Sequence, residues 1–167
     1  RQTCGKWTLL FVYGTLKRGM QWNSKFLCDA HFSAEVVTFD CFPLVVGACG
    51  VPYLLLDRRG AGHHVRGELW SVNADTLEGL DQYEGVDKGY YTRSAIQVEA
   101  SGRLCEAQVY TMAKSPDEFS CLPHLEEYTL EHHQRYKAVV HIQLKQQLYL
   151  QGNVQYAHPE NARHQPK

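Results

Sequence analysis

The sequence predicts an α+β fold in a single domain, and three observations support this prediction. Short apolar, β-rich runs separated by turn residues fill the first two thirds of the chain, a capped helix interrupts them, and apolar residues recur later at helical spacing. With 167 residues, 44% of them hydrophobic, the chain can bury a sizeable core. We expect one domain over residues 1–167, with a helical extension over about 116–152 and a polar tail over 153–167.

The first strand is expected over residues 9–13, Leu-Leu-Phe-Val-Tyr. Because this run has no polar alternation, it is typical of a strand that is buried on both faces or closed into a barrel. Gly14 follows at once and allows the backbone to approach another group closely. The N–H groups of such a turn can bind a carboxylate or a developing oxyanion. The same residues also suit an ordinary strand-to-loop turn.

The following segments alternate between short strands and turns. A short helix capped by Asn23 is expected to continue to about Ala30. Strands are then expected over residues 31–39, 44–46, 52–56, 63–72, 89–98 and 104–112. The connections between them are a break at 41–43, a polar hairpin loop at 57–62 and a turn at 101–102.

The most clearly marked helix begins near residue 73. Asp75 and Glu78 are three residues apart and resemble a capping box, and Gly85 is a typical helix stop. Glu84 therefore falls at the C-terminal end of this helix, where the negative end of the helix dipole disfavours a second negative charge.

The chain changes character after Pro116. A long helix or a helix pair is expected over about 123–150, because apolar residues recur there at helical spacing: Tyr136, Val139, Val140, Leu144 and Leu148. Residues 151–153, Gln-Gly-Asn, would end it.

Composition narrows the possible partners. Seventeen Lys and Arg against 18 Asp and Glu provide no basic field for nucleic acid, and no apolar run approaches the roughly 20 residues that span a bilayer. The start of the chain has no apolar signal-peptide core. The six cysteines are widely spaced and form no Cys-x-x-Cys pair, which favours reduced thiols and a cytoplasmic location.

Several catalytic classes have no counterpart in the sequence. It has no serine nucleophile elbow, Walker loop, dinucleotide fingerprint or zinc-binding His-Glu-x-x-His helix. The pairs His63-His64 and His132-His133, with His141, lack the spacing of metal ligands, so we expect no metal and no cofactor. No cysteine has a neighbouring base that would activate it as a nucleophile.

The remaining candidate is Glu84. A glutamate at a helix end is usually a solvated surface residue, but Tyr83, Tyr90 and Tyr91 are close to it in the sequence. These tyrosines could surround the carboxylate with a partly apolar pocket that also forms hydrogen bonds.

Six short blocks occur in a defined order: VYGTLKRG (12–19), FPLV (42–45), VPYLL (51–55), VRGELWSV (65–72), LDQYE (80–84) and YTR (91–93). In this order they resemble the gamma-glutamyl cyclotransferase-like superfamily, most closely its gamma-glutamylamine cyclotransferase branch. The resemblance covers about residues 8–112, and YAHPEN (156–161) is similar to the tail motif of that branch. It implies a small mixed β-barrel, with a core over about 7–112, flanked by helices.

The resemblance also implies a reaction on a small γ-glutamyl substrate. The α-amine of the γ-glutamyl group attacks its own γ-carbonyl, so that 5-oxoproline and a free amine are released by a lyase or acyltransferase-type aminolysis without a cofactor. Glu84 matches the family's catalytic glutamate, the general base and acid of this reaction. Two alternatives stay open: a cyclotransferase acting on γ-glutamyl amino acids, glutathione or another γ-glutamylated metabolite, and a non-catalytic binding module that retains the pocket.

The resemblance assigns substrate binding to further residues. The backbone amides of one loop match the part of the family that grips the γ-glutamyl group: Tyr13, Gly14, Thr15 and Leu16. These amides could meet either the carboxylate or the γ-carbonyl oxygen. Tyr91 and Arg93 match a pocket-lining pair, and bracing of the barrel is the alternative role for Arg93. The segment over about 123–150 is absent from the family pattern; it could cover the barrel mouth, change substrate choice or mediate self-association.

Overall fold

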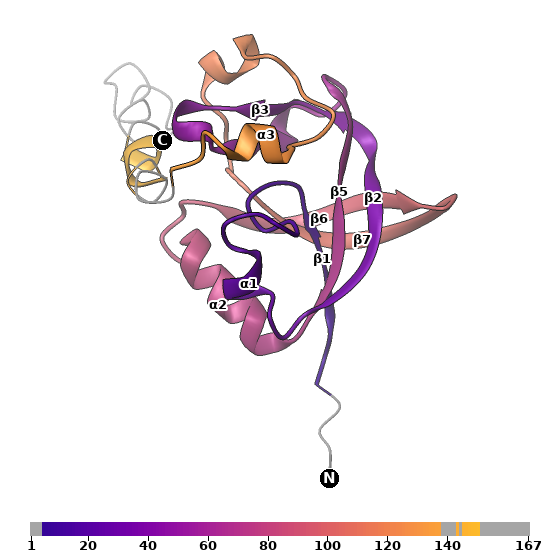
Figure 1. Cartoon of the computed structure of the whole chain (residues 1–167). Helices are drawn as coiled ribbons and strands as arrows, with labels where there is room; N and C mark the ends of the chain where they lie inside the picture. The colour runs from indigo at the N-terminus through magenta and orange to yellow at the C-terminus, as the bar shows by residue number, and fades with distance from the viewer. Residues whose placement is uncertain (1–4, 138–142, 144, 151–167) are drawn as a thin grey trace, which may run out of the picture.

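The computed structural model describes residues 5–137, 143 and 145–150, and a closed five-stranded β-barrel forms its centre (Figure 1). Neighbouring strands follow the order β1-β5-β2-β6-β7. Their bounds are Thr8–Val12 (β1), His31–Phe42 (β2), His63–Val72 (β5), Thr92–Ala100 (β6) and Arg103–Thr111 (β7). Outside the barrel lie a hairpin of β3 (Leu44–Val46) and β4 (Pro52–Leu54) and the helices α1 (Asn23–Phe26), α2 (Ala74–Glu84) and α3 (Leu130–His133). The expected α+β fold, a small mixed barrel flanked by helices, is confirmed.

Strand β1 closes the barrel, because it pairs antiparallel with β5 along its whole length and makes a parallel bridge with β7 at Leu10 and Gln108. Its alternate residues enter different cores. Phe11 belongs to the cluster inside the barrel, whereas Leu10 and Val12 belong to the cluster that includes Leu80 of α2. Burial on both faces explains why this strand has no polar alternation.

Helix α2 lies beside the barrel, next to α1 (Figure 1). Its N-cap is Asn73, whose side chain accepts a hydrogen bond from the N–H of Thr76 at 2.8 Å. The expected capping box that begins at Asp75 is therefore wrong, because Asp75 already lies inside the helix. The expected C-terminus is confirmed: Glu84 is the last helical residue, and Gly85 takes the left-handed conformation with φ 68°.

Three other expected boundaries differ from the structure. Helix α1 stops four residues before Ala30, and Asn23 is its first residue, whose side-chain amide donates to the carbonyl of Leu16 at 2.8 Å instead of capping the helix. Strand β2 continues through residues 41–42, where a break was expected, because β5 still pairs with them. Strand β4 ends at Leu54, two residues early. The remaining strands, β3, β5, β6 and β7, lie close to their expected positions.

Residues 112–129, which we call the strap, cross over the β3-β4 hairpin after the barrel is complete. Apart from a 3-10 turn at Asp117–Cys121, the strap is not helical. It is held by backbone and side-chain bonds to the hairpin region: the N–H of Leu125 donates to the carbonyl of Leu44 at 2.8 Å, and the hydroxyl of Tyr128 donates to the carbonyl of Gly50 at 2.9 Å. A helix could not make these contacts, so the expected helix is wrong in this part.

Beyond the strap, helix α3 is only one turn long, and residues 145–150 form a separate helical turn. The other expected positions of the long helix, Val139, Val140 and Leu144, lie outside the described residues. The tail over 153–167, with its YAHPEN block, also lies outside them.

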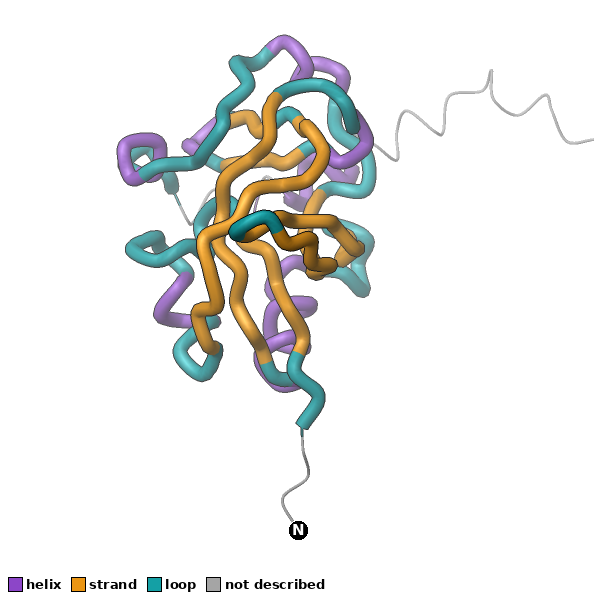
Figure 2. The backbone as a smooth tube through the Cα atoms, turned by 90° about the vertical axis from the view of Figure 1, so that its right-hand side faces the viewer, coloured by secondary structure: helices purple, strands orange, loops and turns teal. Residues whose placement is uncertain are grey.

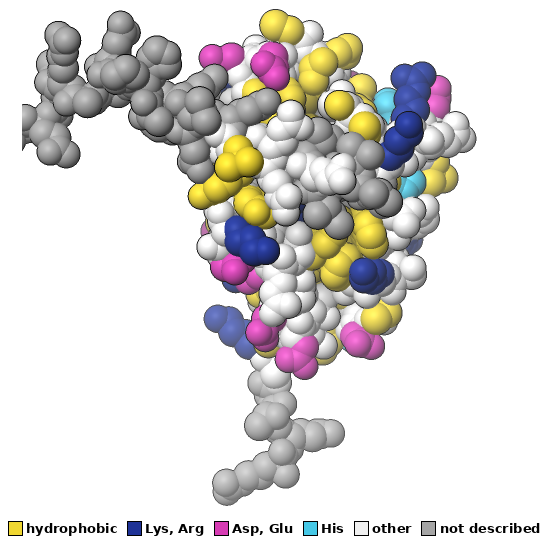
Figure 3. All heavy atoms as spheres, turned by 90° about the vertical axis from the view of Figure 1, so that its left-hand side faces the viewer, with side chains coloured by type: hydrophobic (Ala, Val, Ile, Leu, Met, Phe, Trp, Pro, Cys, Tyr) yellow, Lys and Arg dark blue, Asp and Glu magenta, His cyan; other side chains and the backbone are white. Residues whose placement is uncertain are grey.

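The described surface carries mixed charge. Figure 3 shows Lys and Arg side chains interspersed with Asp and Glu on one face, in keeping with the formal net charge of −1. Figure 2 shows the strands of the barrel at right angles to the view of Figure 1. None of the helices in the described part has the length and apolar character needed to cross a membrane.

We predict that Gly67→Ala destabilises the barrel. A Cβ at Gly67 would lie 2.5 Å from a ring carbon of Phe11 and 2.5 Å from the carbonyl oxygen of Val12, and the backbone oxygen cannot rotate away. Overpacking of this kind typically costs about 1–3 kcal/mol, measurable by denaturant unfolding. The matched control is Gly79→Ala in α2, where the new methyl meets nothing within 4 Å and helix propensity improves. Equal stability of Gly67→Ala and the unchanged protein would contradict the packing described here.

Candidate active site

A cavity opens where β1 ends, between the loop that follows this strand and the C-terminal end of α2. Its walls also include residues from β4, β7 and the connection before β6. The lining residues are Phe11, Val12, Tyr13, Gly14, Thr15, Leu16, Pro52, Glu84, Tyr91 and Tyr110. The structure therefore brings six of the seven candidate site residues together around one cavity.

Glu84 is held in this cavity by the end of α2. Its side chain is buried, with only 7% of the residue exposed. The ammonium of Lys145 lies 2.5 Å from the Oε2 atom of Glu84 and also contacts the carbonyl oxygen of Tyr83 at 3.4 Å. The negative charge that the helix end disfavours is thus compensated by a buried cation, which the pattern around Glu84 did not reveal.

The loop after β1 turns sharply and uses its carbonyl groups internally. The carbonyl oxygen of Gly14 accepts from the N–H of Lys17 at 3.0 Å, and that of Thr15 accepts from the N–H of Trp22 at 3.0 Å. Gly14 is required because a Cβ there would lie 2.5 Å from Cγ of Pro52. The close approach that the glycine suggested is therefore an approach to β4.

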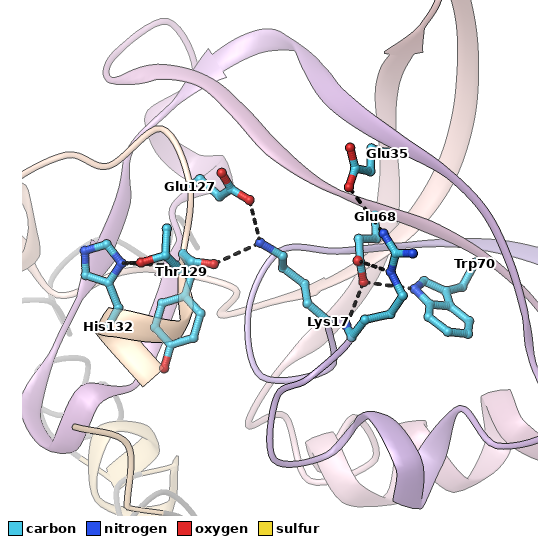
Figure 4. Close-up of polar contacts among 9 residues, drawn as sticks. Lys17, Glu35, Glu68, Trp70, Glu127, Thr129 and His132 are labelled. Carbon is cyan, nitrogen blue, oxygen red and sulfur yellow. Dashed lines mark hydrogen bonds and ion pairs between the residues drawn. The ribbon is translucent and has the colours of Figure 1, made fainter. Parts of the chain in front are cut away.

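The outer side of the same loop is anchored by Glu68 of β5 (Figure 4). This carboxylate is 5% exposed and accepts three hydrogen bonds: from the backbone N–H of Arg18 at 2.8 Å, from its Nε at 2.8 Å and from the indole N–H of Trp70 at 3.3 Å. Because one of these donors is backbone, Glu68 fixes the path of the main chain as well as a side chain.

Lys17 anchors the loop in a second direction (Figure 4). Its ammonium donates to the carboxylate of Glu127 at 3.0 Å and to the carbonyl oxygen of Tyr128 at 2.9 Å, and the residue is 6% exposed. These two contacts tie the loop to the strap, so the cavity wall is connected to both the barrel and the segment that crosses it.

Arg93 does not line the cavity. Its guanidinium forms a two-point ion pair with Asp81 of α2, with distances of 2.9 and 3.2 Å. The hydroxyl of Tyr110 also donates to Asp81 at 2.6 Å. Asp81 thus joins α2 to β6 and β7, and Arg93 has the bracing geometry that was its alternative role.

Two tyrosines in the cavity are neutral hydrogen-bonding groups. Burial raises the pKa of Tyr13 and of Tyr91 well above the usual value, and the nearby charge of Glu84 adds to the shift. The hydroxyl of Tyr13 donates to the carbonyl oxygen of Tyr110 at 2.8 Å. At neutral pH these phenols remain protonated, so among the groups around the cavity they are donors and not bases.

No group of three or more His, Cys, Asp or Glu side chains in the described part of the chain has an arrangement that could hold a metal ion. His132 stacks on Tyr128, and His133 stacks on Tyr136. His141 lies outside the described residues. The five cysteines within them are free thiols.

Comparison with known proteins agrees with this geometry. A model of the family described as gamma-glutamyl cyclotransferase, AIG2-like matches residues 10–130, which is more than half of the chain. The chain belongs to this family. The matched range contains the loop after β1, Glu84 and Glu68, but it ends before Lys145.

Individual relatives support the same assignment. The gamma-glutamylaminecyclotransferase of Mus musculus is 38% identical over 136 residues, which are 73% of this chain and 89% of that protein. The crystal structure of an AIG2-like protein from Mus musculus superposes with a TM-score of 0.68 at 37% identity, covering 75% of this chain and 90% of that one. A protein of Arabidopsis thaliana is 42% identical over 100 residues, which are 56% of this chain; the match spans about half, 52%, of that relative.

Sequence reasoning missed several residues that shape the site. Glu68 and Asp81 lie inside the family-like blocks but had no role. Arg18 lies 50 residues before Glu68, and Arg93, 12 residues after Asp81, was assigned to the pocket. A charged residue with apolar neighbours, as Glu68 is beside Leu69 and Trp70 in β5, was the available signal, since such residues are rarely buried without partners. Lys17 carried the same signal in the first loop. Lys145 had none, because a lysine in a polar segment is unremarkable.

We predict that Glu68→Gln loosens the loop after β1. The neutral amide would place an N–H donor against the Arg18 donors and remove a charge-assisted bond, which typically contributes about 1.5–3 kcal/mol. The measurement is the free energy of unfolding, together with amide hydrogen exchange at residues 14–18. The matched control is Glu35→Gln, since Glu35 bonds the same arginine at 3.2 Å but its side chain is 80% exposed, and exposed pairs contribute about 0–1 kcal/mol. Equal effects of the two variants would show that Glu68 does not anchor the loop.

We also predict that the protein loses stability as the pH rises above about 10, where tyrosines of the unfolded chain ionise. Because the pKa values of Tyr13 and Tyr91 are raised, the folded state keeps protons that the unfolded state loses. The free energy of unfolding should therefore fall by up to about 1.4 kcal/mol per pH unit for each such tyrosine. Denaturant unfolding across this pH range checks the slope, and Tyr13→Phe should make it shallower. Ionisation of all tyrosines near their usual pKa in the folded protein would refute this prediction.

Proposed function

We propose that the protein is a gamma-glutamyl cyclotransferase that releases 5-oxoproline and a free amine from a γ-glutamylamine-type substrate. The observation that carries this proposal is the position of Glu84, which lines the same cavity as the backbone loop over residues 13–16. Family membership supports the reaction class, and the name of the Mus musculus relative supports an amine as the leaving group.

The proposed reaction needs few protein groups because the substrate supplies its own nucleophile. Nitrogen of the α-amine attacks the γ-carbonyl carbon, which forms the five-membered ring. The bond between this carbon and the leaving nitrogen then breaks. Intramolecular attack from a held, curled conformation can lower the activation barrier by about 7–11 kcal/mol, because the orientational entropy is lost before the reaction step.

The reaction also requires protons to pass from the attacking nitrogen to the leaving nitrogen. The α-ammonium must lose two protons before the lactam N–H is left, and the leaving nitrogen must gain two to depart as an ammonium ion. Glu84 takes the two protons from the α-nitrogen one after the other and delivers each to the leaving nitrogen, so the carboxylate is unchanged at the end. A positioned carboxylate in this role contributes roughly 10²–10⁴-fold to the rate.

The loop over residues 13–16 supplies polar contacts that do not move during the reaction. The carbonyl groups of Gly14, Thr15 and Leu16 accept hydrogen bonds within the chain. Since the same residues line the cavity, we assign their N–H groups to a ligand. These donors would bind the substrate carboxylate or the oxygen on which negative charge develops. The neutral hydroxyl and ring of Tyr91 complete the wall of the cavity.

We expect Glu84→Gln to abolish turnover while the fold is retained. The assay is release of 5-oxoproline from a series of γ-glutamyl amides, γ-glutamyl amino acids and glutathione, and the expected loss is about 10²–10⁴-fold in kcat. The matched control is Glu78→Gln, an exposed glutamate on the same helix. Preference for γ-glutamyl amino acids or glutathione would correct the substrate class, and binding without turnover in the unchanged protein would favour a binding module.

A further inference from the structure

Lys145 reaches the candidate active site from a part of the chain that the family model does not match, since that match ends at residue 130. The residue is 4% exposed, and its ammonium lies 2.5 Å from the Oε2 atom of Glu84. A buried lysine requires a charged or strongly polar partner. Glu84 provides that partner, so the two charges compensate each other.

The helical turn over residues 145–150 is held in place by more than this ion pair. The ring of Tyr149 packs edge-on against Tyr90 at a centroid distance of 5.3 Å, and Leu148 packs against the core cluster that also includes Leu80 of α2. The contact of Tyr149 is made with the connection that follows α2, which carries Tyr90. The turn is therefore docked beside Glu84 by apolar contacts on the same side.

The surroundings of the Lys145 ammonium are those of an ammonium-binding subsite. The carboxylate of Glu84 lies on one side, and the carbonyl oxygen of Tyr83 is 3.4 Å away. The ring of Tyr83 is 4.2 Å from the ammonium and the ring of Tyr91 is 4.8 Å from it, measured to the ring centroids. A carboxylate combined with two aromatic faces binds a primary ammonium through charge and cation–π attraction.

We propose that this is the ammonium subsite of the candidate active site, and that Lys145 occupies it until the α-ammonium of a substrate displaces the lysine. The inference rests on the proposed function, because only that reaction brings a substrate ammonium to Glu84. A second ammonium cannot take the position beside Oε2 and between the two rings while the lysine fills it. Lys145 therefore determines how tightly the substrate binds, without taking part in the bond changes.

The exchange replaces one ammonium by another of the same charge. The buried carboxylate consequently has a cationic partner both before and after substrate binds. The apparent affinity is reduced by the fraction of molecules in which Lys145 is already withdrawn. If Lys145 fills the subsite in nine molecules out of ten, the apparent KM rises about tenfold.

The first test is a steady-state comparison of Lys145→Met with Lys137→Met, assayed by 5-oxoproline release from a γ-glutamyl amide. Met keeps an unbranched side chain of similar length but cannot occupy the subsite as a cation. We expect the KM of Lys145→Met to fall severalfold with kcat unchanged, and Lys137→Met, at an exposed position, to match the unchanged protein. A loss of kcat in Lys145→Met, or an unchanged KM, would overturn the proposal.

The second test needs no variant and no turnover. Acetic anhydride modifies only accessible, deprotonated amines, and mass spectrometry can compare Lys145 with Lys137 in the intact chain. We expect Lys145 to be acetylated more slowly than Lys137, and the ratio of the two rates to rise when L-glutamate, which carries an α-ammonium, is added at saturation. The amine of L-glutamate also consumes reagent, but this lowers both rates alike and leaves their ratio unchanged. Equal rates for the two lysines, or no effect of L-glutamate, would overturn the subsite.

The two tests separate the failure of this inference from the failure of the proposed function. Protection of Lys145 and its release by L-glutamate, without turnover of any γ-glutamyl compound, would support the subsite and reject the reaction. Turnover that depends on Glu84, with Lys145 freely acetylated, would support the reaction and reject the inference.

Discussion

The buried carboxylate of Glu68 is the contact on which the geometry of the site depends. It bonds the backbone N–H of Arg18 from inside β5, so the loop after β1 is fixed relative to the barrel wall and not only to its own neighbours. Lys17 holds the same loop from the strap. The charged contacts that position the loop are made by Lys17 and Arg18, which do not line the cavity. The part of the loop that lines the cavity therefore needs no charged side chain to hold it. Backbone donors held in this way can act on a ligand without reorganising.

Glu84 is positioned differently, by helix α2, which is held at both ends and in its middle. Asn73 fixes the start of α2 and Gly85 fixes its end, while Asp81 joins the middle of the helix to two barrel strands through Arg93 and Tyr110. Since Asp81 lies one turn before Glu84, any tilt of the helix would break these bonds before it moved the carboxylate far. The loop and the carboxylate are therefore both anchored to the barrel, which fixes their positions relative to each other.

The sequence predicted those features that depend on local patterns. The apolar run of β1, the glycine that ends α2 and the position of Glu84 all follow from rules that act within a few residues. The cap at Asn73 was missed because Asn and Asp are almost equally good caps and two candidates lay two residues apart. The helix expected from the spacing of apolar residues over 136–148 was extended back to about residue 123, into the strap. Residues 125 and 128 bond the hairpin region instead, a contact that periodicity cannot show. Glu68, Lys17 and Lys145 act mainly through partners that lie 50, 111 and 61 residues away.

Burial of the carboxylate explains why a cation from outside the family-matched region is found beside it. A cavity walled by protonated tyrosines stabilises an isolated negative charge poorly, since the phenols Tyr13 and Tyr91 stay neutral and the medium around them is apolar. In such a cavity the ionised carboxylate of Glu84 needs a cationic partner. Lys145 meets that need in the ligand-free chain, and a γ-glutamyl group, which carries an ammonium of its own, would meet it during the proposed reaction. The burial that would make Glu84 selective for a substrate with an ammonium group is therefore also what recruits Lys145 in the ligand-free chain.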